Sequence, residues 1–142
     1  MNDALKLKNQ LCFPLYACAK EVIRRYTPLL DNIGLTYTQY IAMLVLWEHE
    51  CISVKELGKL LYLDSGTLTP MLKKMEKMGL IYRNRNNKDA RIVMISITPK
   101  GKELENQAAC IPTKMTQCVT LNNAEAMQLY TLLYKLLQTL NN

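Results

Sequence analysis

The chain has 142 residues, of which 49% are hydrophobic, and a net charge of +6 from 18 basic and 12 acidic side chains. This length suits a single domain with its own hydrophobic core. No apolar run approaches the roughly 18 residues that a membrane-spanning helix needs, and the first residues lack the basic-then-apolar order of a signal peptide. We therefore expect a cytoplasmic protein that does not interact with membranes.

The cysteine and histidine content limits the metal chemistry. Five cysteines are present, none in a C-x-x-C pair, and the single histidine, His49, stands between two glutamates. A structural zinc site needs about four such ligands, so we expect no metal site, no cofactor, and a solvated His49. An odd number of thiols in a cytoplasmic chain favours reduced cysteines, and any disulfide would be a signal rather than a structural support.

Apolar residues recur at three- and four-residue steps between residues 11 and 32, which predicts a first helix. Pro14 fits in its first turn, where a missing N–H costs nothing, and this places Cys12 at or just before the helix start. Pro28 is expected to kink or end the regular hydrogen-bond ladder near Arg25.

A second helix is predicted to follow, opened by a capping box of Thr36 and Gln39. Residues 40–47 are apolar almost all round, which is typical of a helix at the centre of a core. Residues 51–52 are the expected stub of a first strand.

Two short helices are predicted next. Ser53 and Glu56 form a second capping box, opening a helix over residues 54–61 with apolar residues on one side. Asp64 is the expected N-cap of the helix after it, and Gly79 its stop.

A strand–turn–strand pattern completes this stretch, with strands over residues 80–83 and 91–95 and a turn over residues 84–89. Helix, turn, helix and basic hairpin make up a winged helix-turn-helix. The expected fold is mainly α with a small β-hairpin wing, an α+β arrangement within one domain over residues 1–142. Residues 33–98, approximately, would be its winged part.

Charge gathers in the same stretch. Residues 51–91 hold nine basic side chains against four acidic ones, so they carry most of the net charge. Such a surface attracts a polyanion, usually duplex DNA, although a solvated basic face without a partner remains an alternative. In the DNA interpretation, lysines and threonines of the second helix reach the major groove, and Asp89 holds Arg91 in a fork at the wing tip. The residues expected to contact DNA are Ser65, Thr67, Thr69, Lys73, Lys74, Lys77, Arg83, Arg85, Lys88, Asp89 and Arg91.

The C-terminal part is predicted to be helical. Thr98 and Pro99 open one helix, Pro112 should bend or interrupt it, and Asn122 with Glu125 caps a last, leucine-rich helix. Leucine-rich helices at both ends, about residues 5–32 and 99–142, exceed what one small core can use, so we expect a homodimer reading a pseudo-palindromic DNA site. The alternative is that both ends cover their own domain.

Several motifs resemble the MarR family of winged-helix regulators. They are the segment of residues 63–70, the Asp89-Ala90-Arg91 triplet of the wing, and residues 97–101. Residues 11–17 and 34–40 resemble, more narrowly, the OhrR-like branch that senses organic hydroperoxides. The similarity covers about residues 8–140.

The resemblance implies a thiol sensor. Cys12 would be oxidised by an organic hydroperoxide to a sulfenic acid, and Tyr26 and Tyr37 would hydrogen-bond its thiolate across the dimer interface. Cys118 matches the resolving thiol of some members, with Cys110 the next candidate. Otherwise a low-molecular-weight thiol would cap Cys12. Oxidation would then release the repressor from DNA.

Three other functions stay open at this point. A regulator of the same family could respond to a phenolic or lipophilic ligand, or to several oxidants, with Cys12 incidental. A thiol peroxidase is disfavoured, because the chain shows no phosphate loop and no conventional acid/base pair, and we expect no enzyme activity. A winged helix used only for protein contacts is the third.

Overall fold

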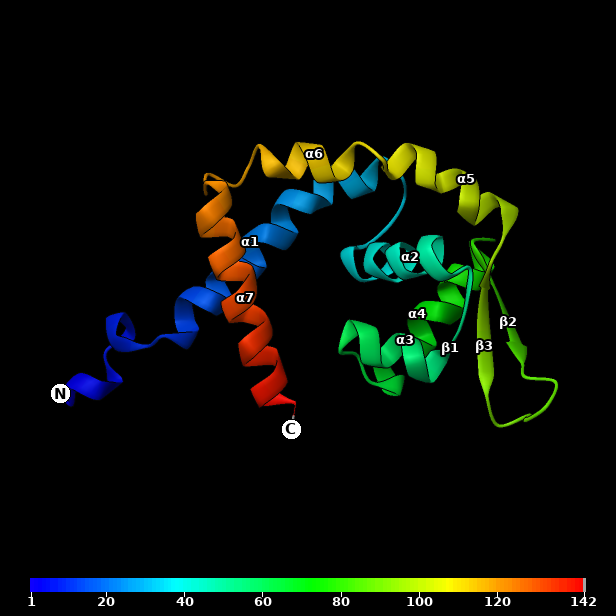
Figure 1. The fold of residues 1–142 in the computed structure, drawn as a ribbon, viewed down its shortest axis with the longest axis horizontal. Helices are drawn as coiled ribbons and strands as arrows, with labels where there is room; N and C mark the ends of the chain where they lie inside the picture. The colour runs from blue at the N-terminus through cyan, green and yellow to red at the C-terminus, as the bar shows by residue number, and fades with distance from the viewer. Residues whose placement is uncertain (142) are drawn as a thin grey trace. The chain divides into compact units, whose positions relative to one another are not determined.

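The computed structural model describes residues 1–141 (Figure 1). Two short 3-10 turns, η1 (Asp3–Leu5) and η2 (Leu7–Asn9), precede the main elements. These are α1 (Cys12–Asp31), α2 (Tyr37–His49), β1 (Cys51–Ser53), α3 (Val54–Leu61), α4 (Ser65–Lys77), β2 (Ile81–Arg85), β3 (Val93–Ile97), α5 (Pro99–Ala108), α6 (Ile111–Thr116) and α7 (Asn123–Leu140). The predicted class, mainly α with a small antiparallel sheet, is confirmed.

The chain forms two compact units, Met1–Ile111 and Pro112–Asn142. The first contains α1, the three-helix core formed by α2, α3 and α4, the sheet, and α5. The second consists chiefly of α7. The single-domain organisation inferred from the sequence stays a prediction.

Helix α2 is the centre of the first unit, as predicted. The capping box forms in full: the Thr36 hydroxyl accepts from the Gln39 N–H at 3.3 Å, and the Gln39 side chain accepts from the Thr36 N–H at 3.0 Å. Ala42, Met43 and Leu46 are completely buried. Because α2 packs against α1, α3, α5 and the sheet, its position sets that of every element around it.

Helices α3 and α4 form the helix-turn-helix. Ser53 caps α3 by accepting from the Glu56 N–H at 3.1 Å, but the reciprocal half of the predicted box is replaced by a Glu56–Lys59 ion pair at 3.7 Å. Tyr62 makes the turn with φ +55°, a left-handed conformation unusual for a tyrosine. Asp64 caps α4, as predicted, by accepting from the Thr67 N–H at 2.8 Å.

The C-terminal end of α4 closes on Gly79, also as predicted. Gly79 has φ +78°, and its N–H donates to the Glu76 carbonyl at 2.9 Å. The Leu80 N–H donates to the Met75 carbonyl at 3.1 Å, which completes a Schellman motif. The chain therefore leaves α4 in a defined direction and enters β2.

The wing is longer than the sequence suggested. The sheet has strand order β1-β3-β2, all antiparallel, and β2 extends to Arg85, which pairs with Val93. The predicted turn over residues 84–89 is therefore wrong at Asn84 and Arg85, and the predicted strand over residues 91–95 is displaced to Val93–Ile97. The loop spans residues 86–92 and is closed by the Asn86 N–H donating to the Ile92 carbonyl at 2.7 Å. Asn84 favours turns, but its cross-strand partner Met94 keeps it in the ladder.

Helix α1 also differs from its prediction. It runs through Pro28 to Asp31, so the ladder does not end near Arg25. A proline removes one backbone N–H, and here the Thr27 hydroxyl adds a bond to the Ile23 carbonyl at 3.1 Å in the same turn. The predicted interruption near Pro112 is confirmed, since α5 ends at Ala108 and α6 begins at Ile111.

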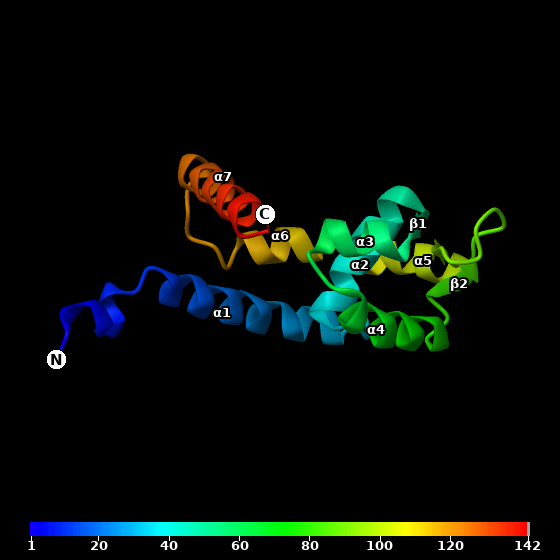
Figure 2. The ribbon, with the colours of Figure 1, turned by 90° about the horizontal axis from the view of Figure 1, so that it is seen from below.

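The terminal helices bury little. In α1 only Leu30 is buried, and the N-terminal half of the helix runs away from α2, α3 and α4 (Figure 2). In the second unit, α7 carries its predicted capping box of Asn122 and Glu125, yet none of its residues is buried. Its leucine-rich face is consequently not covered within its own unit.

Candidate functional site

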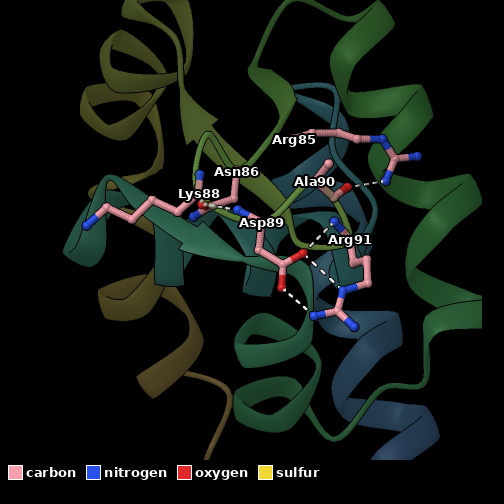
Figure 3. Close-up of polar contacts among 6 residues, drawn as sticks. All are labelled: Arg85, Asn86, Lys88, Asp89, Ala90 and Arg91. Atoms are coloured by element: carbon pink, nitrogen blue, oxygen red, sulfur yellow. Dashed lines mark hydrogen bonds and ion pairs between the residues drawn. The ribbon is translucent and has the colours of Figure 1, made fainter.

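The wing tip is held by a network around Asp89 and Arg91 (Figure 3). The Arg91 guanidinium donates from Nε to Asp89 Oδ1 at 3.1 Å and from Nη2 to Asp89 Oδ2 at 3.0 Å, and the Arg91 N–H donates to Oδ1 at 3.0 Å. These bonds from Arg91 lower the pKa of Asp89. The predicted fork is confirmed, and 90% of the Arg91 side chain is exposed.

The loop behind the fork is ordered by its own side chains. Asn86 Oδ1 accepts from the N–H groups of Lys88 at 2.8 Å and Asp89 at 3.1 Å. Arg85 Nη1 donates to the Ala90 carbonyl at 2.9 Å. The loop therefore presents the Lys88 and Arg91 cations from a fixed backbone (Figure 3).

Helix α4 separates an apolar inner face from a cationic outer one. Leu68, Leu72 and Met75 are buried, whereas the polar positions lie outside. The exposed predicted residues are Ser65, Thr67, Lys73, Lys74 and Lys77, with Thr69 half-buried. An exposed helix with this composition, followed by a basic wing, matches the surface that winged helices present to a duplex.

Arg83 lies differently from the other predicted DNA contacts. Its side chain is only 22% exposed, its Nη1 lies 3.9 Å from Glu76 Oε1, and its N–H donates to Glu76 Oε2 at 3.2 Å. Its Nε is buried without a hydrogen-bond partner among the described residues. The guanidinium would have to leave Glu76 to reach DNA, and in this position it joins β2 to α4.

Cys12 is the first residue of α1, as predicted, and its side chain is exposed. Phe13, Leu15 and Tyr16 around it are exposed apolar residues. The thiol therefore lies on an uncovered apolar surface.

The two predicted tyrosines belong to a larger aromatic cluster. The Tyr26 and Tyr37 ring centroids are 4.9 Å apart, and Tyr40 lies 5.7 Å from Tyr26 and 6.4 Å from Tyr37. Burial raises the pKa of all three phenols above the ordinary value of 10.0. They stay protonated at neutral pH and can donate hydrogen bonds. Sequence reasoning missed Tyr40, although its spacing of three residues from Tyr37 puts both on one side of α2.

The thiol and the tyrosines of one chain cannot meet. Tyr26 lies 14 residues after Cys12 on α1 (26 − 12), which is a rise of about 21 Å at 1.5 Å per residue. A hydrogen bond needs about 3 Å. Only the Cys12 of a second copy could reach this pair of phenols.

The other cysteines, Cys18, Cys51, Cys110 and Cys118, are exposed and free. Cys118 follows α6 in the second unit, and its Sγ lies 3.8 Å from the Lys114 carbonyl. Within residues 1–141 no cluster of three or more His, Cys, Asp and Glu side chains could hold a metal ion. None of the helices described there is long and apolar enough to cross a membrane.

The three-helix core, the basic outer face of α4 and the cationic wing define a winged-helix DNA-binding protein. A family model described as "Transcriptional regulator SarA/Rot" matches residues 24–108, more than half of the chain. The chain belongs to this family of transcriptional regulators.

Among curated proteins, the organic hydroperoxide resistance transcriptional regulator of Bacillus subtilis is 50% identical over 139 residues, covering 98% of this chain and 95% of that protein. The regulator SarZ of Staphylococcus epidermidis is 41% identical, covering 86% of each. The predicted resemblance to hydroperoxide-sensing winged-helix regulators is confirmed, and these relatives are named as regulators rather than enzymes.

AbfR of Staphylococcus epidermidis has been solved in several forms. The reduced form bound to DNA is 31% identical with a TM-score of 0.83, covering 99% of this chain and 96% of that one. The overoxidised form bound to DNA has 32% identity and a TM-score of 0.79, covering 96% and 95%. The disulfide form has 33% identity and a TM-score of 0.70, covering 96% and 93%.

Proposed function

We propose that this regulator is a cytoplasmic homodimeric repressor whose reduced form binds duplex DNA and whose oxidation at Cys12 by an organic hydroperoxide releases it. One observation carries the redox part. The exposed Cys12 begins the same helix on which Tyr26 lies about 21 Å away, so the thiol and the protonated tyrosines form one site only between two copies.

The DNA surface follows from the exposed cations. Helix α4 would enter the major groove, with Ser65, Thr67 and Thr69 near base edges and Lys73, Lys74 and Lys77 on phosphates. Arg85, Lys88 and Arg91 would reach the neighbouring minor groove from the wing, with Asp89 orienting Arg91. We assign Arg83 to holding α4 against β2 through Glu76 rather than to a base or phosphate.

The dimer is supported by the apolar surface at both ends of the chain. Leu7, Leu11 and Tyr16 near the N-terminus are 59%, 82% and 60% exposed, and α7 buries no residue at all. A soluble monomer rarely leaves contiguous patches of this kind uncovered. A second copy of the same helices is the partner that also brings Cys12 to the tyrosines.

The first step needs only the Cys12 thiol and the peroxide. The Cys12 thiolate attacks one peroxide oxygen, the O–O bond breaks, and the alkoxide leaves as an alcohol after taking a proton. Sulfur is oxidised by two electrons to a sulfenic acid. Condensation with a second thiol then forms an S–S bond and releases water. That thiol is Cys118 of the second copy, Cys110, or a low-molecular-weight cellular thiol.

The second step is the one we assign to DNA release. AbfR has been solved bound to DNA while overoxidised, and separately in its disulfide form. A sulfur that only carries extra oxygens still fits beside the tyrosines, whereas a disulfide ties Cys12 to a new partner and displaces the α1 helices of the two copies. The DNA-reading surfaces would then no longer match two half-sites one helical turn apart.

The experiment begins with a duplex selected by the reduced protein from a random 30-base-pair library. Binding of this duplex is measured before and after one equivalent of cumene hydroperoxide, with and without a small thiol. The parent should lose the duplex, Cys12→Ser should keep it, and the matched control Cys18→Ser should behave as the parent. Retention by the parent when both the hydroperoxide and the small thiol are present, or release by Cys12→Ser, would refute thiol sensing.

The resolving thiol is identified by non-reducing electrophoresis and intact-mass measurement of the same samples. A covalent dimer that disappears in Cys118→Ser assigns the partner-copy cysteine, whereas a monomer heavier by one small thiol assigns an external cap. Peroxide consumption should stop at one equivalent per Cys12, since a regulator reacts once. Sustained turnover with a reductant would instead make the protein a peroxidase.

A further inference from the structure

We propose that Trp47 is a positioning residue that links the tyrosine cluster to the C-terminal end of the DNA-reading helix α4. The inference deepens the proposed function and rests on it, because it names the residue through which a change at the tyrosines would reach α4.

The first contact runs along α2. Tyr40, 3% exposed, packs against both Tyr26 and Tyr37, and its ring makes an edge-on contact with Trp47 at 6.4 Å between centroids. Protein interiors are close-packed, so a ring that moves in this cluster displaces its neighbours. Trp47 is the last aromatic residue in that series.

The second contact leaves α2. Trp47 Nε1 donates to the Gly101 carbonyl at 2.9 Å, across 54 residues of sequence. Gly101 lies in the first turn of α5, where a Cβ would overlap the Leu80 carbonyl and the Ile97 side chain. The indole N–H therefore bonds a backbone segment that has no room to shift on its own.

The third contact joins α5 to the end of α4. The Gly101 N–H donates to Thr98 Oγ1 at 3.0 Å, and the Thr98 hydroxyl donates to the Gly79 carbonyl. That second bond is 2.6 Å long, and Gly79 is the residue that terminates α4. Lys100 Nζ donates to the Met78 carbonyl of the same helix end at 2.8 Å. The first turn of α5 is thus bonded to the end of α4 through two side chains, so a change in the Trp47–Gly101 bond reaches α4.

If Trp47 served only to fill space between α2 and α5, a side chain of similar volume could replace its indole. The hydrogen bond to a backbone carbonyl is what a phenylalanine of similar shape cannot make. An ion pair of Lys102 with Glu50, at 2.9 Å, joins the same two helices outside the aromatic series. It supplies the matched control, because removing it loosens α2 and α5 without touching Trp47.

Trp47 is the only tryptophan of the chain, so its fluorescence reports on this link directly. Emission is recorded without DNA before and after cumene hydroperoxide and a small thiol. We expect a red shift in the parent, as the indole N–H exchanges the Gly101 carbonyl for water, and no shift in Cys12→Ser. Unchanged emission in a parent that does release its selected duplex would overturn the inference.

The second test measures coupling. Duplex affinity is compared between reduced and oxidised protein, and the ratio of the two is the quantity of interest. In Trp47→Phe this ratio should fall about 3- to 10-fold, the size of one hydrogen bond, while reduced affinity and the rate of Cys12 oxidation stay within about twofold. Lys102→Met should keep the parental ratio.

The outcomes separate the two claims. A parent that keeps its duplex after oxidation refutes the proposed function itself. If the parent releases its duplex on oxidation and Trp47→Phe shows the same ratio of reduced to oxidised affinity, only the role of Trp47 is refuted. If Trp47→Phe fails to fold, the pair Thr98→Val and Thr98→Ser tests the same link, because serine restores the hydroxyl. Thr98→Ser should then recover the ratio that Thr98→Val loses, and equal ratios would contradict the link.

Discussion

The winged part and the terminal helices of this regulator differ in how far their apolar side chains are buried. Between α2 and β3, residues such as Met43, Leu46, Leu57 and Ile95 are completely buried. In α1 only Leu30 is buried, and in α7 no residue is. The first region covers its own apolar groups, whereas the second leaves them exposed.

The difference shows where each region obtains its stability. The winged part can fold from its own contacts, because burial of apolar area is the main favourable term in folding. Helix α1 lacks a side-chain N-cap, α7 has a capping box, and most of the stability of a helix in a protein comes from packing of its apolar face. In the dimer that we propose, a partner surface supplies this packing, so folding and dimerisation would be coupled at the ends of the chain and separate in its middle.

The largest expected effect comes from emptying the core of the winged part. Leu46→Ala removes a fully buried side chain from α2 and should lower the free energy of unfolding by about 2–5 kcal/mol. The matched control is Leu44→Ala on the same helix, which is 42% exposed and should cost less than about 1 kcal/mol. Urea titration measures both, and equal losses would contradict a self-contained core.

The next effect tests the ends. Leu129→Glu places a charge on the exposed apolar face of α7 and should raise the dimer dissociation constant about 30-fold or more, equivalent to about 2 kcal/mol. The control Gln128→Glu adds the same charge at the neighbouring polar position. Sedimentation equilibrium measures the dissociation constant of both variants. An unchanged constant in Leu129→Glu would show that α7 does not contribute to the interface.

A smaller effect is expected on the salt dependence of DNA binding, which distinguishes a lysine of the winged part from a lysine near the N-terminus. Lys73→Ala on α4 should reduce the slope of log affinity against log salt by about 1.8, because each copy of the proposed dimer loses one phosphate contact worth about 0.9. Lys8→Ala removes an equally exposed cation near the N-terminus and should leave the slope unchanged. Titrations of the selected duplex between 50 and 200 mM salt measure both slopes. Equal slopes in the two variants would mean that the net charge of the protein attracts DNA and that Lys73 makes no phosphate contact.

The same division explains what could be predicted from the sequence. Caps at Thr36, Asp64, Thr98 and Asn122 were predictable, because each depends on side chains within three residues of the helix start. The wing register was not, since cross-strand pairing overrode the turn preference of Asn84.

Contacts between distant parts of the chain were also out of reach. Arg83 reads as one more exposed cation of a basic strand, and only the packing of β2 on α4 brings it to Glu76. The bond from Trp47 to Gly101 spans 54 residues and has no local signal. The buried Tyr40 is the one missed residue that helical spacing could have revealed.

The smallest expected effect is a change in stability at alkaline pH. It concerns the tyrosine cluster, which lies where α1 contacts α2. Burial raises the pKa of Tyr26, Tyr37 and Tyr40, so above about pH 10 the unfolded chain loses phenolic protons that the folded chain retains. The folded state then binds more protons, and the free energy of unfolding must fall as pH rises past the ordinary tyrosine pKa, with no contribution below it.

Replacing Tyr26 and Tyr37 together by phenylalanine should therefore flatten the loss of stability as the pH rises above about 10. Urea titrations at closely spaced pH values measure it, with Tyr16→Phe as the control that removes a phenol from α1 outside the cluster. A double variant as alkali-sensitive as the parent would mean that these phenols are as well solvated in the folded protein as in the unfolded chain. In that case they would lie in water rather than in the enclosed cluster that a partner thiolate needs.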